Sequence, residues 1–88
     1  MSVRVHVGSI LHGYTGGASE LVAEGATLRD VLSDLDRAHP GLLFRIVDEQ
    51  GALRPHVKLY VGDRFVRELG TRVSAGATVH VLQALSGG

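Results

Sequence analysis

The chain contains no cysteine and no tryptophan, and its 88 residues include only two prolines, two tyrosines and two phenylalanines. Without cysteine there can be no disulfide, no thiolate metal site and no cysteine nucleophile. Nine basic side chains balance nine acidic ones, so we expect no general attraction to nucleic acid or to an anionic membrane surface. These absences favour another protein as the binding partner.

Long apolar runs are also missing. No stretch approaches the roughly 18 apolar residues of a membrane span, and the opening MSVRVHV lacks the basic and apolar regions of a signal peptide. We therefore expect a cytoplasmic protein. A chain of 88 residues has room for one domain with a single core, which we place over 1–88.

The first part of the sequence alternates apolar and polar residues. The segment SVRVHV predicts a strand whose valines are buried, and ASELVAE predicts a second strand with Leu21 and Ala23 turned inward. The two strands are expected to form an antiparallel hairpin through a long glycine-rich connection. Within that connection, Gly16 and Gly17 suit a turn that requires positive φ.

The periodicity then changes to that of a helix. Thr27 suits the N-cap and Asp30 suits the first turn, where a carboxylate is favourable. Pro40 and Gly41 end the helix. One helical face collects the apolar residues Leu28, Val31, Leu32 and Leu35. The following segment, 41–55, is compatible with either a short helical turn or an irregular loop.

Three further strands are predicted, over 56–61, 64–67 and 77–83, with a turn at Gly62-Asp63 between the first two. The alternation turns Tyr60, His80 and Leu82 outward. The predicted core residues are Val5, Leu21, Val31, Leu35, Leu59 and Val81.

The order of elements is strand, strand, helix, strand, strand, strand. If the first and last strands are neighbours, they run parallel, because a crossover separates them. One amphipathic helix covers only one face of the sheet. We therefore predict an α+β protein of the β-grasp, or ubiquitin-like, fold: a mixed sheet of four to five strands, with one main helix across one face.

The segment 53–88, LRPHVKLYVGDRFVRELGTRVSAGATVHVLQALSGG, resembles the small ubiquitin-like sulfur carriers, the family of the molybdopterin synthase small subunit and the thiamine-thiazole sulfur carrier. It is most similar to the longer members, such as the carrier of thiocarboxylate-dependent cysteine synthesis. The resemblance implies that an E1-like enzyme uses ATP to adenylate the carboxylate of Gly88. That carboxylate then becomes a thiocarboxylate that donates sulfur to a biosynthetic enzyme.

In this interpretation the chain binds no cofactor and is not itself an enzyme, because ATP is used by the activating enzyme. Gly87 and Ser86 belong to a flexible tail, about 84–88, that threads into the partner, and glycine suits a narrow channel because it has no Cβ. Tyr60, His80, Leu82 and Leu85 are the candidate partner-binding residues. On the open face, Val22 can extend this surface, with Arg4 and Lys58 at its rim; an ordinary solvated strand surface is the competing interpretation.

The five histidines show no metal-ligand spacing, and no serine lies in a Gly-x-Ser-x-Gly motif. We therefore expect no metal site and no catalytic residue of the chain's own. His6 and His80 become neighbours if the first and last strands pair. Either they are two solvated histidines or they form a pH-sensitive contact.

Three classes of function remain open. The first is a sulfur carrier, for cysteine or another thio-metabolite or, alternatively, for molybdopterin synthase. The second is a ubiquitin-like modifier conjugated through Gly88; Lys58 is the only lysine, so chains of modifiers would have a single possible linkage. The third is a binding subunit whose tail takes part in no chemistry.

Overall fold

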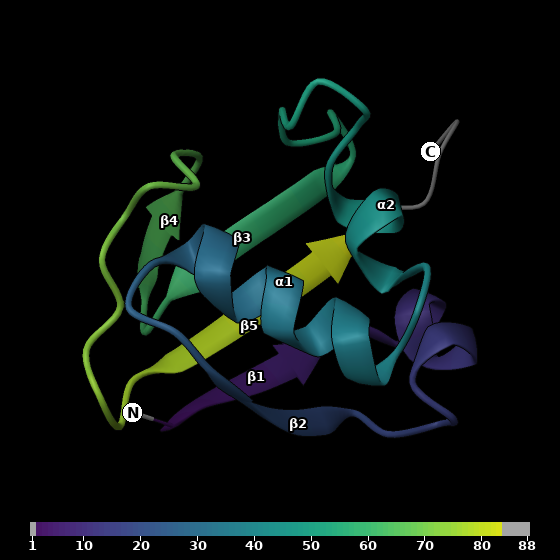
Figure 1. The fold of residues 1–88 in the computed structure, drawn as a ribbon, viewed down its shortest axis with the longest axis horizontal. Coiled ribbons are helices and arrows are strands. Elements are labelled where there is room, and N and C mark those ends of the chain that lie inside the picture. The colour runs from purple at the N-terminus through teal and green to yellow at the C-terminus, as the bar shows by residue number, and fades with distance from the viewer. Residues whose placement is uncertain (1, 84–88) are drawn as a thin grey trace.

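The computed structural model describes residues 2–83, apart from the side chain of Ile10. The fold is a five-stranded mixed sheet with strand order β2-β1-β5-β3-β4. Helix α1, Leu28–Ala38, lies across one face of this sheet (Figure 1). The strands are β1 (Ser2–Val7), β2 (Glu20–Glu24), β3 (Val57–Val61), β4 (Arg64–Val66) and β5 (Thr78–Gln83). The predicted fold class is confirmed.

The first and last strands meet in the middle of the sheet. β1 pairs antiparallel with β2 as a hairpin and parallel with β5, where Val5 lies opposite Val79. β5 also pairs antiparallel with β3, which leads into β4 through the predicted turn at 62–63. The parallel contact is possible because the whole chain between β1 and β5, including α1, separates the two strands.

Helix α1 forms where the sequence predicts it. The Thr27 hydroxyl accepts a hydrogen bond from the Asp30 amide at 3.3 Å, which satisfies one of the free N–H groups of the first turn. The four predicted apolar residues are all buried: Leu28, Val31, Leu32 and Leu35. This face rests on the inward valines of the central strands and forms the core with them.

One predicted core residue is wrong. Val5, Val31, Leu35, Leu59 and Val81 are at most 2% exposed. Leu21, by contrast, is only partly buried and packs against the margin of the core. The reason is its position on β2, the outermost strand, where it has neighbouring strand side chains on one side only.

The two connections at the ends of β1 and α1 contain short helices. The glycine-rich connection holds a 3-10 helix, η1 (Ser9–Tyr14), which the sequence did not predict, and its Leu11 is fully buried. Gly16 and Gly17 follow with φ of 67° and 91°, as the predicted turn requires. Of the two conformations left open for 41–55, a helical turn is present as α2 (Leu42–Ile46), followed by a loop.

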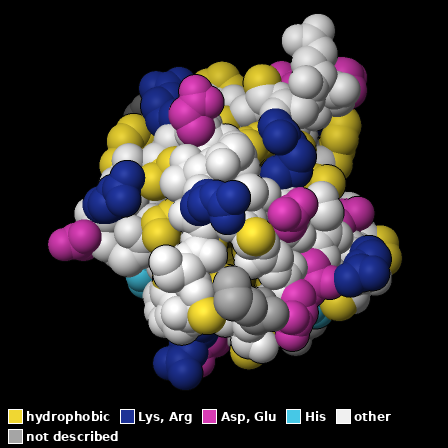
Figure 2. Space-filling view, turned by 60° about the vertical axis from the view of Figure 1, so that its left-hand side comes forward, with side chains coloured by type: hydrophobic (Ala, Val, Ile, Leu, Met, Phe, Trp, Pro, Cys, Tyr) yellow, Lys and Arg dark blue, Asp and Glu magenta, His cyan; other side chains and the backbone are white. Residues whose placement is uncertain are grey.

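The surface carries charges of both signs. Figure 2 shows Lys and Arg side chains interspersed with Asp and Glu over the presented face, without a broad area of one sign. Within residues 2–83, no helix is both long enough and apolar enough to cross a membrane.

Candidate functional site

The predicted reactive end of the chain lies outside the described residues. This applies to Leu85, Ser86, Gly87 and Gly88, and to the whole predicted tail 84–88. The structure does describe the strand that leads to them. β5 is the central strand, and its last residue, Gln83, pairs with Val57 of β3. Any segment after Gln83 therefore starts at the end of the central strand.

The face of the sheet opposite α1 carries a row of side chains that crosses all five strands. Successive register partners form this row, from the outer strand β2 to the outer strand β4: Glu20, His6, His80, Tyr60 and Phe65. Register partners on one face lie close enough to interact. We name this set the cross-sheet row.

Contacts within the cross-sheet row are polar on β2 and β1 and aromatic on β3 and β4. His6 Nε2 lies 3.0 Å from a carboxylate oxygen of Glu20. The ring centroids of His6 and His80 are 5.4 Å apart. Tyr60 and Phe65 form a tilted aromatic pair with centroids 5.5 Å apart, and Phe65 is 50% exposed. The row thus presents an aromatic surface on β3 and β4 and a polar surface on β1 and β2.

Leu82 extends this surface toward the end of β5. It is 44% exposed and lies opposite the exposed Lys58 of β3. The Gly8 amide donates to the Val81 carbonyl at 2.9 Å, and a Cβ on Gly8 would lie 3.6 Å from Leu82 Cδ2. The absence of a side chain at Gly8 leaves Leu82 accessible from this side.

The structure therefore brings together Tyr60, His80 and Leu82, three of the predicted partner-binding residues. Val22 is exposed but lies two strands away from β5, opposite Arg4 of β1. Phe65 is not among the residues predicted for this surface. Two features of the sequence could have predicted that Phe65 pairs with Tyr60: alternation turns Phe65 outward on the short fourth strand, and a two-residue turn joins that strand to the third.

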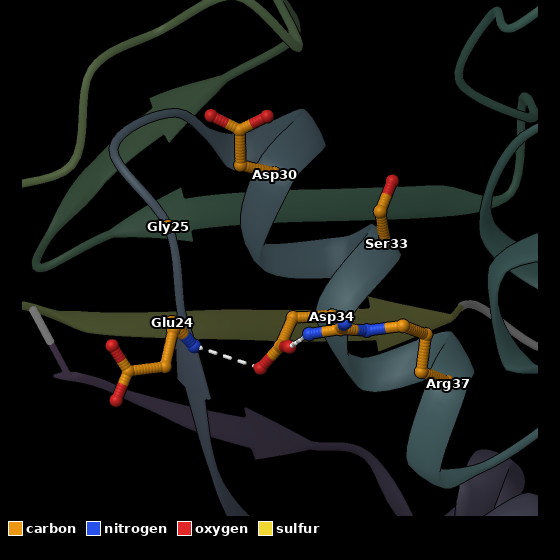
Figure 3. Close-up of a pocket in the computed structure, with 6 residues that line it drawn as sticks. All are labelled: Glu24, Gly25, Asp30, Ser33, Asp34 and Arg37. Carbon is orange, nitrogen blue, oxygen red and sulfur yellow. Dashed lines mark hydrogen bonds and ion pairs between the residues drawn. The ribbon is translucent and has the colours of Figure 1, made fainter.

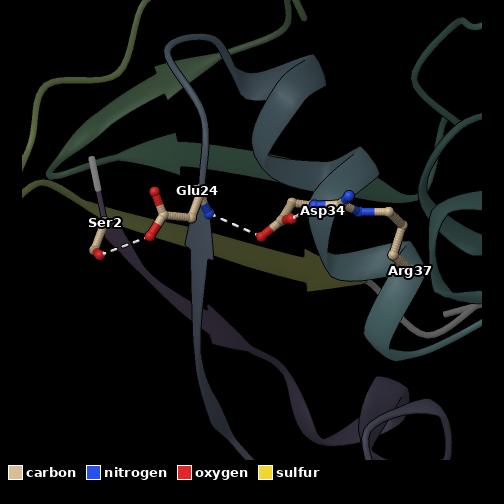
Figure 4. A network of polar contacts seen from close by, with 4 residues as sticks. All are labelled: Ser2, Glu24, Asp34 and Arg37. Atoms are coloured by element: carbon tan, nitrogen blue, oxygen red, sulfur yellow. Dashed lines mark hydrogen bonds and ion pairs between the residues drawn. The ribbon is translucent and has the colours of Figure 1, made fainter.

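A separate hollow of about 500 Å³ lies between β2 and α1 and is lined by Glu24, Gly25, Asp30, Ser33, Asp34 and Arg37 (Figure 3). Three of its lining residues, Glu24, Asp34 and Arg37, are linked by hydrogen bonds. The Glu24 amide and the Arg37 guanidinium both donate to the carboxylate of Asp34, and the Ser2 hydroxyl donates to the carboxylate of Glu24 (Figure 4). This network fastens the outer strand β2 to α1.

Arg37 first, and then the Glu24 amide, lower the pKa of Asp34 below its ordinary value. Because the pKa is lower in the folded chain than in the unfolded chain, ionised Asp34 stabilises the fold at neutral pH. That contribution is lost in acid as the pH falls through the folded pKa. The polar contacts in this hollow therefore serve to attach β2 to α1.

Between residues 2 and 83, no group of three or more His, Asp or Glu side chains is placed to hold a metal ion.

The first and last strands run parallel at the centre of a mixed sheet, one helix covers a single face, and the other face is open beside the end of β5. These features define a ubiquitin-like β-grasp protein. Comparison with known families agrees with this class. The chain belongs to the ThiS family, whose model matches residues 10–88.

Individual relatives support the assignment over the whole length. The chain is 38% identical over 93 aligned residues to the sulfur carrier protein CysO of Mycobacterium tuberculosis, with all of both chains covered. Among solved structures, it matches a chain of the Amycolatopsis orientalis BexX/CysO complex with a TM-score of 0.90 and 35% identity, covering 98% of this chain and 99% of the other. It also matches SAMP1 of Haloferax volcanii with a TM-score of 0.86 and 25% identity, over the whole of both chains.

Proposed function

We propose that the chain is a sulfur carrier that holds sulfur as a thiocarboxylate at Gly88. The observation that carries the proposal is the 38% identity, over the full length of both chains, to a protein named as a sulfur carrier. The chain also has no cysteine, so a side-chain thiol cannot hold the sulfur. We assign this role to the C-terminal carboxylate of Gly88, as the resemblance to the sulfur carriers implies.

The proposed chemistry needs an activating enzyme. A carboxylate is a poor electrophile, so ATP first converts it to an acyl adenylate with release of pyrophosphate. Hydrosulfide then attacks the acyl carbon, forms the C–S bond and displaces AMP, leaving the thiocarboxylate. The carrier contributes the carboxylate and the folded body, and the activating enzyme contributes the ATP site.

Glycine at the end of the chain suits this reaction. A backbone without Cβ atoms passes through a narrow channel and adopts whatever φ the channel requires. Ordering each tail residue on docking costs roughly 1–2 kcal/mol of backbone entropy, and contacts made by the folded body must offset that cost. The part of the cross-sheet row on β5, β3 and β4, together with Leu82, is the surface that we assign to this role.

The partner that accepts the sulfur is a second enzyme. A CysO chain with a TM-score of 0.90 to this chain was solved as part of a complex with BexX, which supports a stable complex between a carrier of this shape and another protein. We propose that the present chain likewise delivers its sulfur while it is docked on a biosynthetic enzyme.

The intact mass of the protein purified from its native cell tests the proposed function. We expect a population in which one oxygen is replaced by sulfur at the terminus, and fragmentation should place the exchange on Gly88. A variant lacking Gly88 is the control and should show no exchange. Unmodified mass under all growth conditions would contradict the carrier function and favour a binding subunit whose tail takes part in no chemistry.

A second candidate function, protein modification through Gly88, is favoured by the 25% identity to SAMP1, which is named a small archaeal modifier protein. In that case the same mass measurement gives covalent adducts in which Gly88 is linked to lysine. Self-conjugation would require Lys58, the only lysine, which is exposed on β3. Adducts that persist in a Lys58→Arg variant would then be conjugates with other proteins.

Substitution of Tyr60 or Leu82 tests the docking surface. We expect Tyr60→Ala and Leu82→Asp to weaken binding to the activating or accepting enzyme by about 1–3 kcal/mol, the usual effect of losing an interface anchor. Leu82 is substantially exposed and Tyr60 is half-buried on the open face, so the thermal midpoint should change little. Titration calorimetry measures the affinity and a melting curve measures the stability.

Val22→Ala is the matched control, because Val22 is exposed on the same face but lies on the outer strand β2. Its affinity should equal that of the wild type. Unchanged affinity in both the Tyr60 and Leu82 variants would place the docking surface elsewhere on the molecule.

A further inference from the structure

A second group of exposed aromatic side chains lies outside the sheet surface. Phe44 of α2 is 56% exposed, and Tyr14, at the end of η1, is 38% exposed. An arginine lies against each ring: Arg54 against Phe44 and Arg45 against Tyr14. We name these four residues, Tyr14, Phe44, Arg45 and Arg54, the α2 patch.

The two arginines of the α2 patch are held in place by their rings. The guanidinium carbon of Arg54 lies 4.6 Å from the ring centroid of Phe44, and its Nε donates to the Phe44 carbonyl at 2.7 Å. The guanidinium carbon of Arg45 lies 5.6 Å from the ring centroid of Tyr14. A positive group held over an aromatic face is already ordered before a partner binds, so little side-chain entropy remains to be lost.

The carboxylates around the patch are engaged with the backbone. Asp36 accepts hydrogen bonds from the amides of Gly41 and Leu43, both at 3.1 Å. Asp48 accepts from the amides of Gln50 and Ala52 at 2.9 and 3.0 Å.

Throughout residues 2–83, the ion pairs found involve neither Arg45 nor Arg54. The patch therefore offers a partner two guanidinium groups that lie outside these ion pairs, together with apolar rings. Arg54 is attracted by the Asp48 carboxylate, whose pKa is lowered mainly by the backbone amides that donate to it and further by Arg54, and Arg45 is the more exposed of the two arginines. A hollow of about 240 Å³ beside Phe44, lined in part by Leu43 and Val47, can receive an apolar side chain.

The α2 patch is at the end of the sheet where β5 finishes. The Arg54 amide donates to the Ile46 carbonyl of α2, and the Val57 amide donates to the Arg54 carbonyl, both at 3.0 Å. Val57 in turn pairs with Gln83, the last residue of β5. Figure 1 shows α2 beside the arrowhead of β5. A protein that encloses the segment after Gln83 must therefore approach the α2 patch.

We infer that the α2 patch docks on the rim of the enzyme site that takes up the tail, and that this rim presents carboxylates together with an apolar side chain. The inference rests on the proposed function, because it assumes that an enzyme takes up the tail. It follows from charge complementarity, since two ordered guanidinium groups that take part in none of the ion pairs found among residues 2–83 are best matched by acidic groups. The attraction between Arg54 and Asp48 reduces this effect for Arg54 and leaves Arg45 as the stronger contributor. The patch and the cross-sheet row then form two separate contacts with that enzyme.

Salt-dependent binding measures this contact. The test compares the wild-type chain with an Arg45→Gln/Arg54→Gln double variant and with Phe44→Ala, by calorimetry against the purified activating enzyme and the purified accepting enzyme, at low and high salt. For at least one enzyme, we expect the double variant to bind roughly tenfold more weakly at low salt and to lose most of the salt dependence. Phe44→Ala should weaken binding about fivefold or more at both salt concentrations.

Arg64→Gln/Arg72→Gln is the matched control, with the same change of charge at exposed positions. Arg64 pairs with Val61, which pairs with Val79 near the start of β5, so it lies at the opposite end of the strand from the α2 patch. Arg72 bridges to Thr27 at the start of α1. This variant should keep the wild-type affinity and salt dependence, and melting curves should show that every variant is folded.

Wild-type affinity and salt dependence in the double variant and in Phe44→Ala, for both enzymes, would overturn the inference. A parallel assay separates this outcome from a failure of the proposed function. If the wild-type chain forms no thiocarboxylate with the activating enzyme, ATP and a sulfide source, the carrier function fails, whatever the binding data show. If the wild type forms it and deletion of Gly88 abolishes it, while the patch variants bind normally, the carrier function stands and only the α2 patch contact is wrong.

Discussion

Deletion of Gly88 is expected to abolish activation of the chain by its adenylating enzyme. The reaction occurs on the carboxylate of that residue, and a chain one residue shorter holds its carboxylate short of the phosphate that it must attack. Gly87→Phe is expected to have the same effect, because a bulky side chain cannot pass through a channel that admits glycine. ATP–pyrophosphate exchange with the activating enzyme measures both variants.

Neither variant should affect the fold. The buried hydrophobic residues found among residues 2–83 lie between Val3 and Val81, so the melting curves should match that of the wild type. If the melting curves match, a loss of ATP–pyrophosphate exchange can be attributed to the tail and not to unfolding. Undiminished exchange in the Gly88 deletion would contradict the assignment of Gly88 as the residue that is activated.

Leu35→Ala is expected to destabilise the protein by about 2–5 kcal/mol, the usual cost of removing a large apolar side chain from a core. Leu35 is 2% exposed on the face of α1 that packs against the sheet. For a domain of 60–100 residues, each kcal/mol lowers the thermal midpoint by about 4–8 °C. The change can therefore remove a large share of the roughly 5–15 kcal/mol that stabilises a native domain. Thermal and denaturant unfolding measure it.

Ser33→Ala on the same helix is the control. Ser33 is exposed, so its substitution should change the free energy of unfolding by no more than about 0.5 kcal/mol. A thermal midpoint for Leu35→Ala within a degree or so of the wild type would contradict the assignment of the buried helix face.

The regular parts of the fold could be predicted because each shows a clean period. Alternation identified the valines of β1 and β5, and the change to a helical period, with Thr27 as N-cap, identified α1. η1 was missed because a 3-10 helix of six residues is too short to show a period. Leu21 was assigned to the core because alternation gives the inward direction of a side chain but not the position of its strand within the sheet.

The candidate site, like the fold, could be predicted only in part. Outward alternation placed Tyr60, His80 and Leu82 on one face, but the cross-sheet row depends on strand register, which brings Phe65 into line with Tyr60. The α2 patch could not be predicted. It depends on the path of two loops, and Phe44 stands in an apolar segment where only its neighbours Leu42 and Ile46 are buried.

The central position of β5 also has a mechanical consequence. β5 is hydrogen-bonded along one edge to β1 and along the other to β3. Force applied through the tail pulls β5 along its own axis, so the bonds of both ladders bear the load together and are not opened one after another. A partner can therefore pull on the tail while the domain stays folded.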